Sequence, residues 1–217
     1  MLFRSDSDEG EVWMMRSDGS DAVRLTANGA VERNAELSPD GRWVLFLADV
    51  NDRFEPYYND NLFLVPAAGG EHRMLLRDMP YEVRQAQWDR DGTTIYFTAN
   101  TGVRTELFEV DVASEELTQL TTGDHALGGW SYFPATRRHV FGIDERANAG
   151  DVHMMPADGQ DTPTKITGVY DYLDRQFRLP RQDAIQWTGA DGTTVEGLLS
   201  DRKSTRLNSS HSSVSRM

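Results

Sequence analysis

The feature that most constrains the fold is an internal repeat of about 45 residues. One element of the repeat is a short apolar run, a turn, and a closing Leu-Thr or Ile-Thr pair or a similar ending; its copies begin near residues 12, 62, 107 and 152. A second element lies between these copies. It reads LSPDGRWVLFLA from Leu37, WDRDGTTIYFTA from Trp88 and, in a degraded form, YFPATRRHVFGI from Tyr132. Both elements share one period, which indicates a repetitive architecture.

Each element has the chemistry of a β-hairpin. In the turn at residues 38–41, Pro39 presets φ, Asp40 can accept bonds from nearby N–H groups, and Gly41 adopts a left-handed conformation at low cost. The β-branched and aromatic run that follows is typical of a buried strand. Two hairpins per repeat give four antiparallel strands, which is one blade of a β-propeller. The alternative is a β-sandwich whose hairpins are similar by accident, and the in-register copies disfavour it.

We therefore expect an all-β fold, a partial β-propeller of about three and a half four-stranded blades over residues 1–168. The aromatic residues within the strands should form the core between blades; they are Trp13, Trp43, Trp88 and Phe97. A propeller that is not closed exposes blade edges, so we expect these edges to self-associate.

The repeat resembles the propeller repeat shared by Tol-B-like proteins and serine peptidases of the prolyl-oligopeptidase family, and the resemblance covers roughly residues 3–167. Residues 169–182 lack the repeat signature and are interpreted as a connector. Residues 183–200 contain a strand, the turn Asp191-Gly192 and a second strand, a pattern that resembles the opening hairpin of the α/β-hydrolase domain in those peptidases. A final irregular blade is the alternative for this hairpin.

The resemblance implies a fragment of a serine peptidase that cleaves short peptides, in which the propeller gates access of substrate. In that family the nucleophile lies within G-x-S-x-G and is followed by Asp and His. No G-x-S-x-G occurs in the 217 residues, so the triad is expected beyond Ser200 and the chain alone is predicted to be inactive. The alternative function is that of a non-enzymatic, Tol-B-like propeller that binds other proteins.

Two segments are candidates for contact with substrate. Dipeptidyl peptidases of the family grip the amine of the substrate with acidic propeller residues, and Asp144, Glu145 and Arg146 follow an expected strand and precede an Ala-Asn-Ala-Gly loop. The alternative for this triplet is a solvated turn on an acidic surface. The insert at residues 51–61 could line the mouth of the propeller, although an ordinary loop between strands is the simpler interpretation.

Composition excludes several classes of cofactor and partner. The chain has no Cys, and four of its His residues are scattered over separate repeats without ligand spacing, so no metal site and no cofactor are expected. The formal net charge of −13 argues against nucleic acid as a partner. No apolar run is long enough to span a membrane. Peptides are the expected partners, and the compartment stays open because a targeting segment would precede Met1.

The last seventeen residues, 201–217, differ from the body of the chain. They hold four basic side chains against one acidic one, six Ser and no aromatic residue. Residues 201–211 resemble the in-frame translation of a sequencing adapter. We interpret residues 201–217 as an artefactual tail, with a disordered C-terminus as the alternative, and give them no role in the fold.

Overall fold

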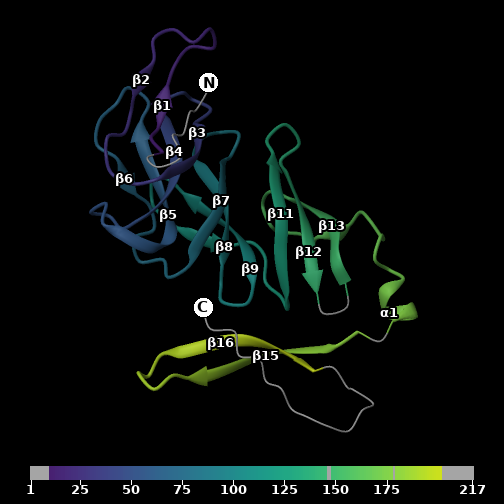
Figure 1. Cartoon of the computed structure of the whole chain (residues 1–217). Helices are drawn as coiled ribbons and strands as arrows, with labels where there is room; N and C mark the ends of the chain where they lie inside the picture. Colours follow the sequence, from purple (N-terminus) through teal and green to yellow (C-terminus); the bar gives the residue numbers. More distant parts are fainter. Residues whose placement is uncertain (1–9, 146–147, 178, 202–217) are drawn as a thin grey trace.

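The computed structural model describes residues 10–145, 148–177 and 179–201. Three four-stranded blades, each antiparallel within itself, follow one another along the chain (Figure 1). A parallel pairing of Ala126 with Thr105 joins the second and third blades into one eight-stranded sheet. The first comprises β3 (Glu32–Leu37), β4 (Trp43–Val50), β5 (Pro56–Pro66) and β6 (Arg73–Met74). The second comprises β7 (Glu82–Trp88), β8 (Thr94–Asn100), β9 (Thr105–Asp111) and β10 (Leu117–Gln119). The third comprises β11 (His125–Phe133), β12 (Arg138–Glu145), β13 (Asn148–Pro156) and β14 (Thr164–Lys165).

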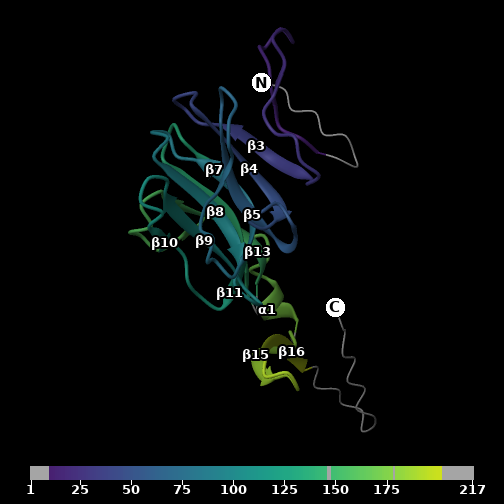
Figure 2. The ribbon, with the colours of Figure 1, turned by 90° about the vertical axis from the view of Figure 1, so that its left-hand side faces the viewer.

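Two smaller hairpins flank the blades. The strands β1 (Trp13–Met14) and β2 (Val23–Arg24) form half a blade before the first one. After the third blade, the chain passes through the single-turn helix α1 (Leu173–Gln176) and then forms the hairpin of β15 (Arg181–Thr188) and β16 (Thr194–Asp201). The two hairpins lie at opposite ends of the molecule (Figure 2). The expected all-β, partial propeller is confirmed. No helix in the described part of the chain is long and apolar enough to cross a membrane.

The strands of the first and second blades carry apolar residues on both faces because each of these blades packs against two neighbours. In β4, Leu45 and Leu47 pack toward the second blade, whereas the alternating Phe46 packs toward β1–β2. We call the contact of β1–β2 with the first blade the first seam, that of the first and second blades the second seam, and that of the second and third blades the third seam. In β8, Phe97 fills the second seam and its neighbour Tyr96 fills the third.

A closing threonine ties the outer strand to an earlier strand in three of the four repeats, whereas the first blade ends in Leu75-Leu76 and lacks this hydroxyl. Thr121 Oγ1 accepts a hydrogen bond from the Leu107 backbone N–H at 2.9 Å and donates to the Glu106 carboxylate at 2.6 Å. Thr26 and Thr167 make the equivalent pair of bonds in their own repeats. A threonine recurs there because its hydroxyl can accept and donate at once, and this satisfies a buried backbone N–H and a carboxylate together.

The turns also behave as the sequence predicts. The Asp40 carboxylate accepts hydrogen bonds from the Ser38 hydroxyl at 2.6 Å and from the Arg42 N–H at 3.0 Å, which lower the pKa of Asp40 to about 2. Gly41 adopts φ +72° in the same turn. Asp191 accepts the Thr193 N–H at 3.0 Å in the turn between β15 and β16.

One expectation about the core is wrong. Trp88 and Phe97 are buried between blades and Trp43 packs against the second seam, but the Trp13 side chain is 39% exposed. In the short strand β1, the neighbouring residue Met14 takes the side that packs into the first seam. Trp13 therefore lies on the opposite face, which no blade covers among the described residues.

The outer face of the third blade is also partly uncovered in the described structure. Phe133 is 50% exposed and Ile166 is 53% exposed, whereas His139 and Phe141 on the other face of this blade are fully buried. Self-association through such edges stays a prediction. The tail from 202 to 217 lies outside the described residues; Asp201, which we assigned to it, is the last residue of β16.

Candidate functional site

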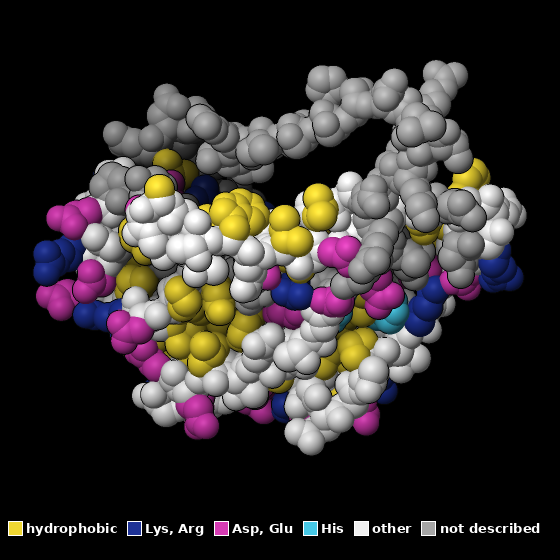
Figure 3. Space-filling view, turned by 90° about the horizontal axis from the view of Figure 1, so that it is seen from below, with side chains coloured by type: hydrophobic (Ala, Val, Ile, Leu, Met, Phe, Trp, Pro, Cys, Tyr) yellow, Lys and Arg dark blue, Asp and Glu magenta, His cyan; other side chains and the backbone are white. Residues whose placement is uncertain are grey.

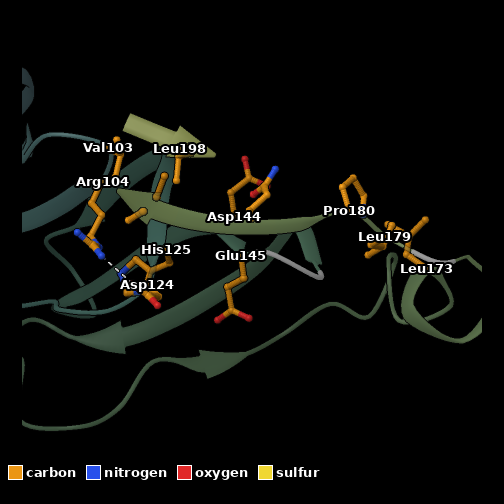
Figure 4. A pocket seen from close by; sticks show the side chains of 13 residues that line it. Val103, Arg104, Asp124, His125, Asp144, Glu145, Leu173, Leu179, Pro180 and Leu198 are labelled. Carbon is orange, nitrogen blue, oxygen red and sulfur yellow. Dashed lines mark hydrogen bonds and ion pairs between the residues drawn. The ribbon is translucent and has the colours of Figure 1, made fainter. Parts of the chain in front are cut away.

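A cavity of about 490 Å³ lies between the second and third blades on one side and the β15–β16 hairpin on the other (Figure 4). Its lining falls into a polar and an apolar group. The polar group comprises Arg104, Asp124, His125, Asp144, Glu145 and Gln182. The apolar group comprises Val103, Ala126, Leu173, Leu179, Pro180, Ala184 and Leu198.

The propeller side of the cavity is built by the same end of two adjacent blades. Arg104 comes from the turn that joins the second and third strands of the second blade, and Asp144 and Glu145 come from the corresponding end of β12 in the third blade. The cross-strand register of β11 and β12 places His125 opposite Glu145 and Ala126 opposite Asp144. Equivalent positions in the repeat therefore converge on one face, as the propeller geometry requires.

Charged side chains contact one another at the polar end of the cavity. The Arg104 guanidinium donates to Asp124 at 2.7 Å (Figure 4). It also lies 3.4 Å from the Glu196 carboxylate of the hairpin. The hydrogen bond with Asp124 is the main cause of a raised pKa for Arg104. His125 Nε2 lies 3.2 Å from the buried Glu106 carboxylate, and this contact raises the pKa of His125 above its ordinary value.

Asp144 and Glu145 both line the cavity and are exposed. Within the described part of the chain, no basic side chain forms an ion pair with either carboxylate. Arg146, the third residue of the predicted triplet, lies outside the described residues. The structure thus brings the two acidic members together with Arg104 and His125 at one cavity.

The opposite end of the cavity is apolar. Leu173 comes from α1, and Leu179 and Pro180 come from the segment that leads into β15 (Figure 4). Leu198 of β16 also lines the cavity, but it lies beside Val103 and Arg104 at the other end (Figure 4). The arrangement suits a ligand that carries a positive charge near an apolar group, because the carboxylates face the charge and the apolar wall excludes water.

The insert at residues 51–61 does not reach this cavity. Most of it is the beginning of β5, so the strand starts at Pro56, earlier than the repeat predicts. Asp60 lines a separate cavity of about 500 Å³ with Glu82, Arg84 and Trp130, among others. The loop proper is limited to residues 51–55.

The histidines of the described residues do not form a cluster of metal ligands. His139 is fully buried in the third seam, where burial lowers its pKa to about 4 and Trp130 donates a hydrogen bond to its Nδ1 at 3.3 Å. His125 pairs with Glu106 as described above. No group of three or more potential metal ligands occurs among the described residues. Asp89, in a turn that superficially resembles a calcium loop, instead accepts a hydrogen bond from the Tyr132 hydroxyl.

Arg104, Asp124 and the hairpin residue Glu196 were not predicted as site residues. For Arg104 the available signal was its position in the repeat, because it occupies the turn of the second blade that corresponds to residues 144–146 in the third. Glu196 carried no local signal. Its role depends on where the hairpin packs, which no short-range pattern encodes.

Comparison with known proteins relates the chain to peptidases in sequence. It is 26% identical over 113 residues to dipeptidyl-peptidase 5 of Porphyromonas gingivalis, a match that covers 51% of this chain and 16% of that protein. It is 29% identical over 97 residues to the uncharacterized peptidase YuxL of Bacillus subtilis, with 45% and 14% covered. The chain thus spans about one sixth of the length of these relatives. No family model matches the sequence.

Solved structures show the same fold. An acylaminoacyl peptidase in complex with Z-Gly-Gly-Phe-chloromethyl ketone superposes with a TM-score of 0.67 at 14% identity, covering 92% of this chain and 29% of that one. A putative TolB from Agrobacterium tumefaciens superposes with a TM-score of 0.56 at 18% identity, covering 85% and 70%. The resemblance to peptidase propellers inferred from the repeats is confirmed, and the Tol-B-like fold is found as well.

Proposed function

We propose that this chain is the substrate-gating propeller portion of a serine peptidase of the prolyl-oligopeptidase family that cleaves short peptides. The observation that carries the proposal is the cavity between the blades and the hairpin, in a chain whose sequence relatives are peptidases. The catalytic triad belongs to an α/β-hydrolase domain that begins with β15–β16, so the chain alone does not hydrolyse peptides.

The hairpin itself supports this assignment. Its cross-strand register places Ile185, Trp187, Val195 and Leu199 on one face, and all four are exposed. Figure 3, which views the molecule from the hairpin side, shows apolar side chains on this surface. A two-stranded sheet with an uncovered apolar face is typical of an element that packs into a larger core. In the proposed enzyme, that core is the hydrolase domain.

The cavity then recognises the amino end of a peptide. A protonated α-amine lies against the Asp144 carboxylate, which points toward the hairpin, while Glu145 on the opposite side of β12 adds negative charge nearby (Figure 4). The side chains of the first residues lie against Leu173, Leu179 and Pro180. Arg104 cannot take this role because it is cationic and already bound to Asp124 and Glu196. The proposed activity is therefore directed to peptides with a free and apolar N-terminus.

Calorimetric titration of the 217-residue chain with Ala-Phe-Leu tests this recognition. At pH 6.5 the peptide amine is protonated, and we expect the N-acetylated peptide to bind at least about tenfold more weakly. The double variant D144N/E145Q should show the same loss toward the free peptide. The control D158N/D161N removes two charges from the β13–β14 turn of the same blade and should bind as the wild type does.

The outcome separates the two functions. Equal affinity for both peptides, or equal effects of the two double variants, would overturn amine recognition. The second candidate, a Tol-B-like binding propeller, is favoured by the match to the putative TolB, of which this chain covers 70%. That function predicts that residues 183–199 pack as part of a blade, so deletion of the hairpin would unfold the third blade.

A further inference from the structure

The β15–β16 hairpin turns one face toward the propeller. The register pairs Ala184 with Leu198 and Gln186 with Glu196, so these four side chains share a face. Ala184 and Leu198 line the cavity described above. Glu196 lies next to them and reaches the second blade.

Glu196 makes two polar contacts with the turn between β8 and β9. Its Oε2 accepts a hydrogen bond from the Val103 backbone N–H at 3.1 Å, and its Oε1 lies 3.4 Å from Arg104 Nη1. Only 18% of the Glu196 side chain is exposed. Because both contacts are charge-assisted and partly shielded from water, they hold more firmly than an exposed ion pair would.

The turn is shaped to admit the Glu196 carboxylate. Gly102 adopts φ +90°, and a Cβ at this position would collide with Glu196 Oε2. The same Cβ would lie 4.0 Å from the Glu196 Cβ. The glycine thus serves two needs, since it permits the left-handed backbone of the turn and leaves room for a side chain from a strand 94 residues later in the sequence.

Arg104 connects this contact to the cavity. Its guanidinium binds Glu196 on one side and Asp124 on the other, and both Arg104 and Asp124 line the cavity. When Glu196 is bound, Leu198 and Ala184 form one wall of the cavity. If the contact opened, this wall would move away and Arg104 would keep only Asp124.

We propose that Glu196 is a positioning residue that latches the hairpin to the β8–β9 turn and so completes the cavity. The effect that we expect of this latch on peptide binding rests on the proposed function. A ligand that needs the complete cavity binds only the latched form, so its apparent dissociation constant rises as the latched fraction falls. Glu196 itself does not touch the ligand.

Hydrogen exchange at the Val103 amide tests the latch without any ligand. This N–H donates to Glu196, so E196A should exchange it at least about tenfold faster than the wild type. The Leu107 amide, which donates to Thr121 in the same blade, should be unchanged and reports that the blade stays folded. The control Q186A alters the cross-strand partner of Glu196 on the same face and should leave Val103 protected. Unchanged exchange at Val103 in E196A would overturn the latch.

A disulfide can replace the carboxylate, because the chain has no Cys and the two Cβ positions lie 4.0 Å apart, within the range of a disulfide. Oxidised G102C/E196C should bind the free-amine peptide as the wild type does, and the same protein after reduction should bind it at least about fivefold more weakly. The control G92C/E196C carries a cysteine at the other end of β8, also at a left-handed glycine, and should neither cross-link nor regain binding.

The outcomes distinguish the two proposals. If the oxidised variant binds no better than the reduced one although the wild type binds, Glu196 acts on the ligand directly and the positioning role is wrong. If the wild type itself does not bind the peptide, the proposed function fails, whereas the exchange measurement at Val103 still decides whether the latch exists.

Discussion

Two of the neighbours of the second blade, the third blade and the hairpin, are held to it by different means. At the third seam it packs against the third blade through fully buried side chains, among them Leu107, Phe141 and His139. At the hairpin interface, the contact of β15–β16 with the β8–β9 turn, Glu196 and Arg104 supply the polar contacts while Leu198 stays 57% exposed. Apolar burial makes the seam a permanent part of the fold, whereas a few polar contacts allow the hairpin to open.

Matched leucines should give the largest contrast between the two contacts. Leu107 is fully buried in the third seam, so L107A should lower the free energy of unfolding by about 2–5 kcal/mol. L198A, at the hairpin interface, should lower it by less than about 1 kcal/mol because most of its side chain already contacts water. Urea denaturation of both variants measures this difference. Equal losses would mean that the hairpin is as integral to the fold as a blade.

Acid should weaken the third seam specifically. His139 is buried, and its pKa falls from the ordinary 6.5 to about 4 because desolvation disfavours the charged form. Between pH 6.5 and 4, His139 is therefore protonated in the unfolded chain but neutral in the folded chain. The stabilising contribution is complete above pH 6.5 and is lost as the pH falls toward 4, on the order of 3 kcal/mol in total.

The variant H139F isolates this effect. It removes the titrating group, so its free energy of unfolding should fall less steeply between pH 6.5 and 4 than that of the wild type, whatever the absolute stability of the variant. Denaturant titrations at a series of pH values compare the two slopes. Parallel slopes would show that His139 is protonated in the folded protein, which the packed third seam does not accommodate.

The sequence alone predicts the blades and their strands, but it does not predict the hairpin interface. Repeated turns such as that at residues 38–41, followed by apolar strands, placed the strands of the three blades, because local chemistry decides them. The family resemblance marked Asp144 and Glu145 as candidate residues, although not their proximity to Arg104. Trp13 was misplaced because period-2 alternation leaves open which side of a two-residue strand faces a neighbour.

The hairpin interface could not be predicted, since it depends on contacts distant in the sequence. Glu196 reads as an ordinary exposed residue of a strand, and Gly102 reads as an ordinary turn glycine. Only the docked hairpin shows that the glycine makes room for the carboxylate. The sequence therefore defines the blades well, while the closed cavity is a property of the tertiary structure.

A single hydroxyl tests the polar part of the third seam. The Tyr132 hydroxyl donates to the Asp89 carboxylate, and both residues are buried. Y132F keeps the ring packing but removes this donor, so it should lower the free energy of unfolding by about 1–3 kcal/mol. The exposed Tyr81 provides the control, since Y81F should change the free energy of unfolding by less than about 0.5 kcal/mol. A neutral Y132F would mean that Arg137, 3.7 Å from Asp89, satisfies that carboxylate alone.

The smallest expected effect is at the rim of the cavity, where His125 responds to pH in the sense opposite to His139. The Glu106 carboxylate raises the pKa of His125, so the folded chain holds this proton more tightly than the unfolded chain does. The stabilising contribution is complete below pH 6.5 and is lost as the pH rises through the folded pKa. NMR titration of the His125 ring should give a pKa above 6.5 in the wild type and a lower one in E106Q. E145Q, which removes the more distant charge across from His125, should lower it less. A wild-type pKa at or below 6.5 would show that burial outweighs Glu106, and the rim would then resemble the seam instead of contrasting with it.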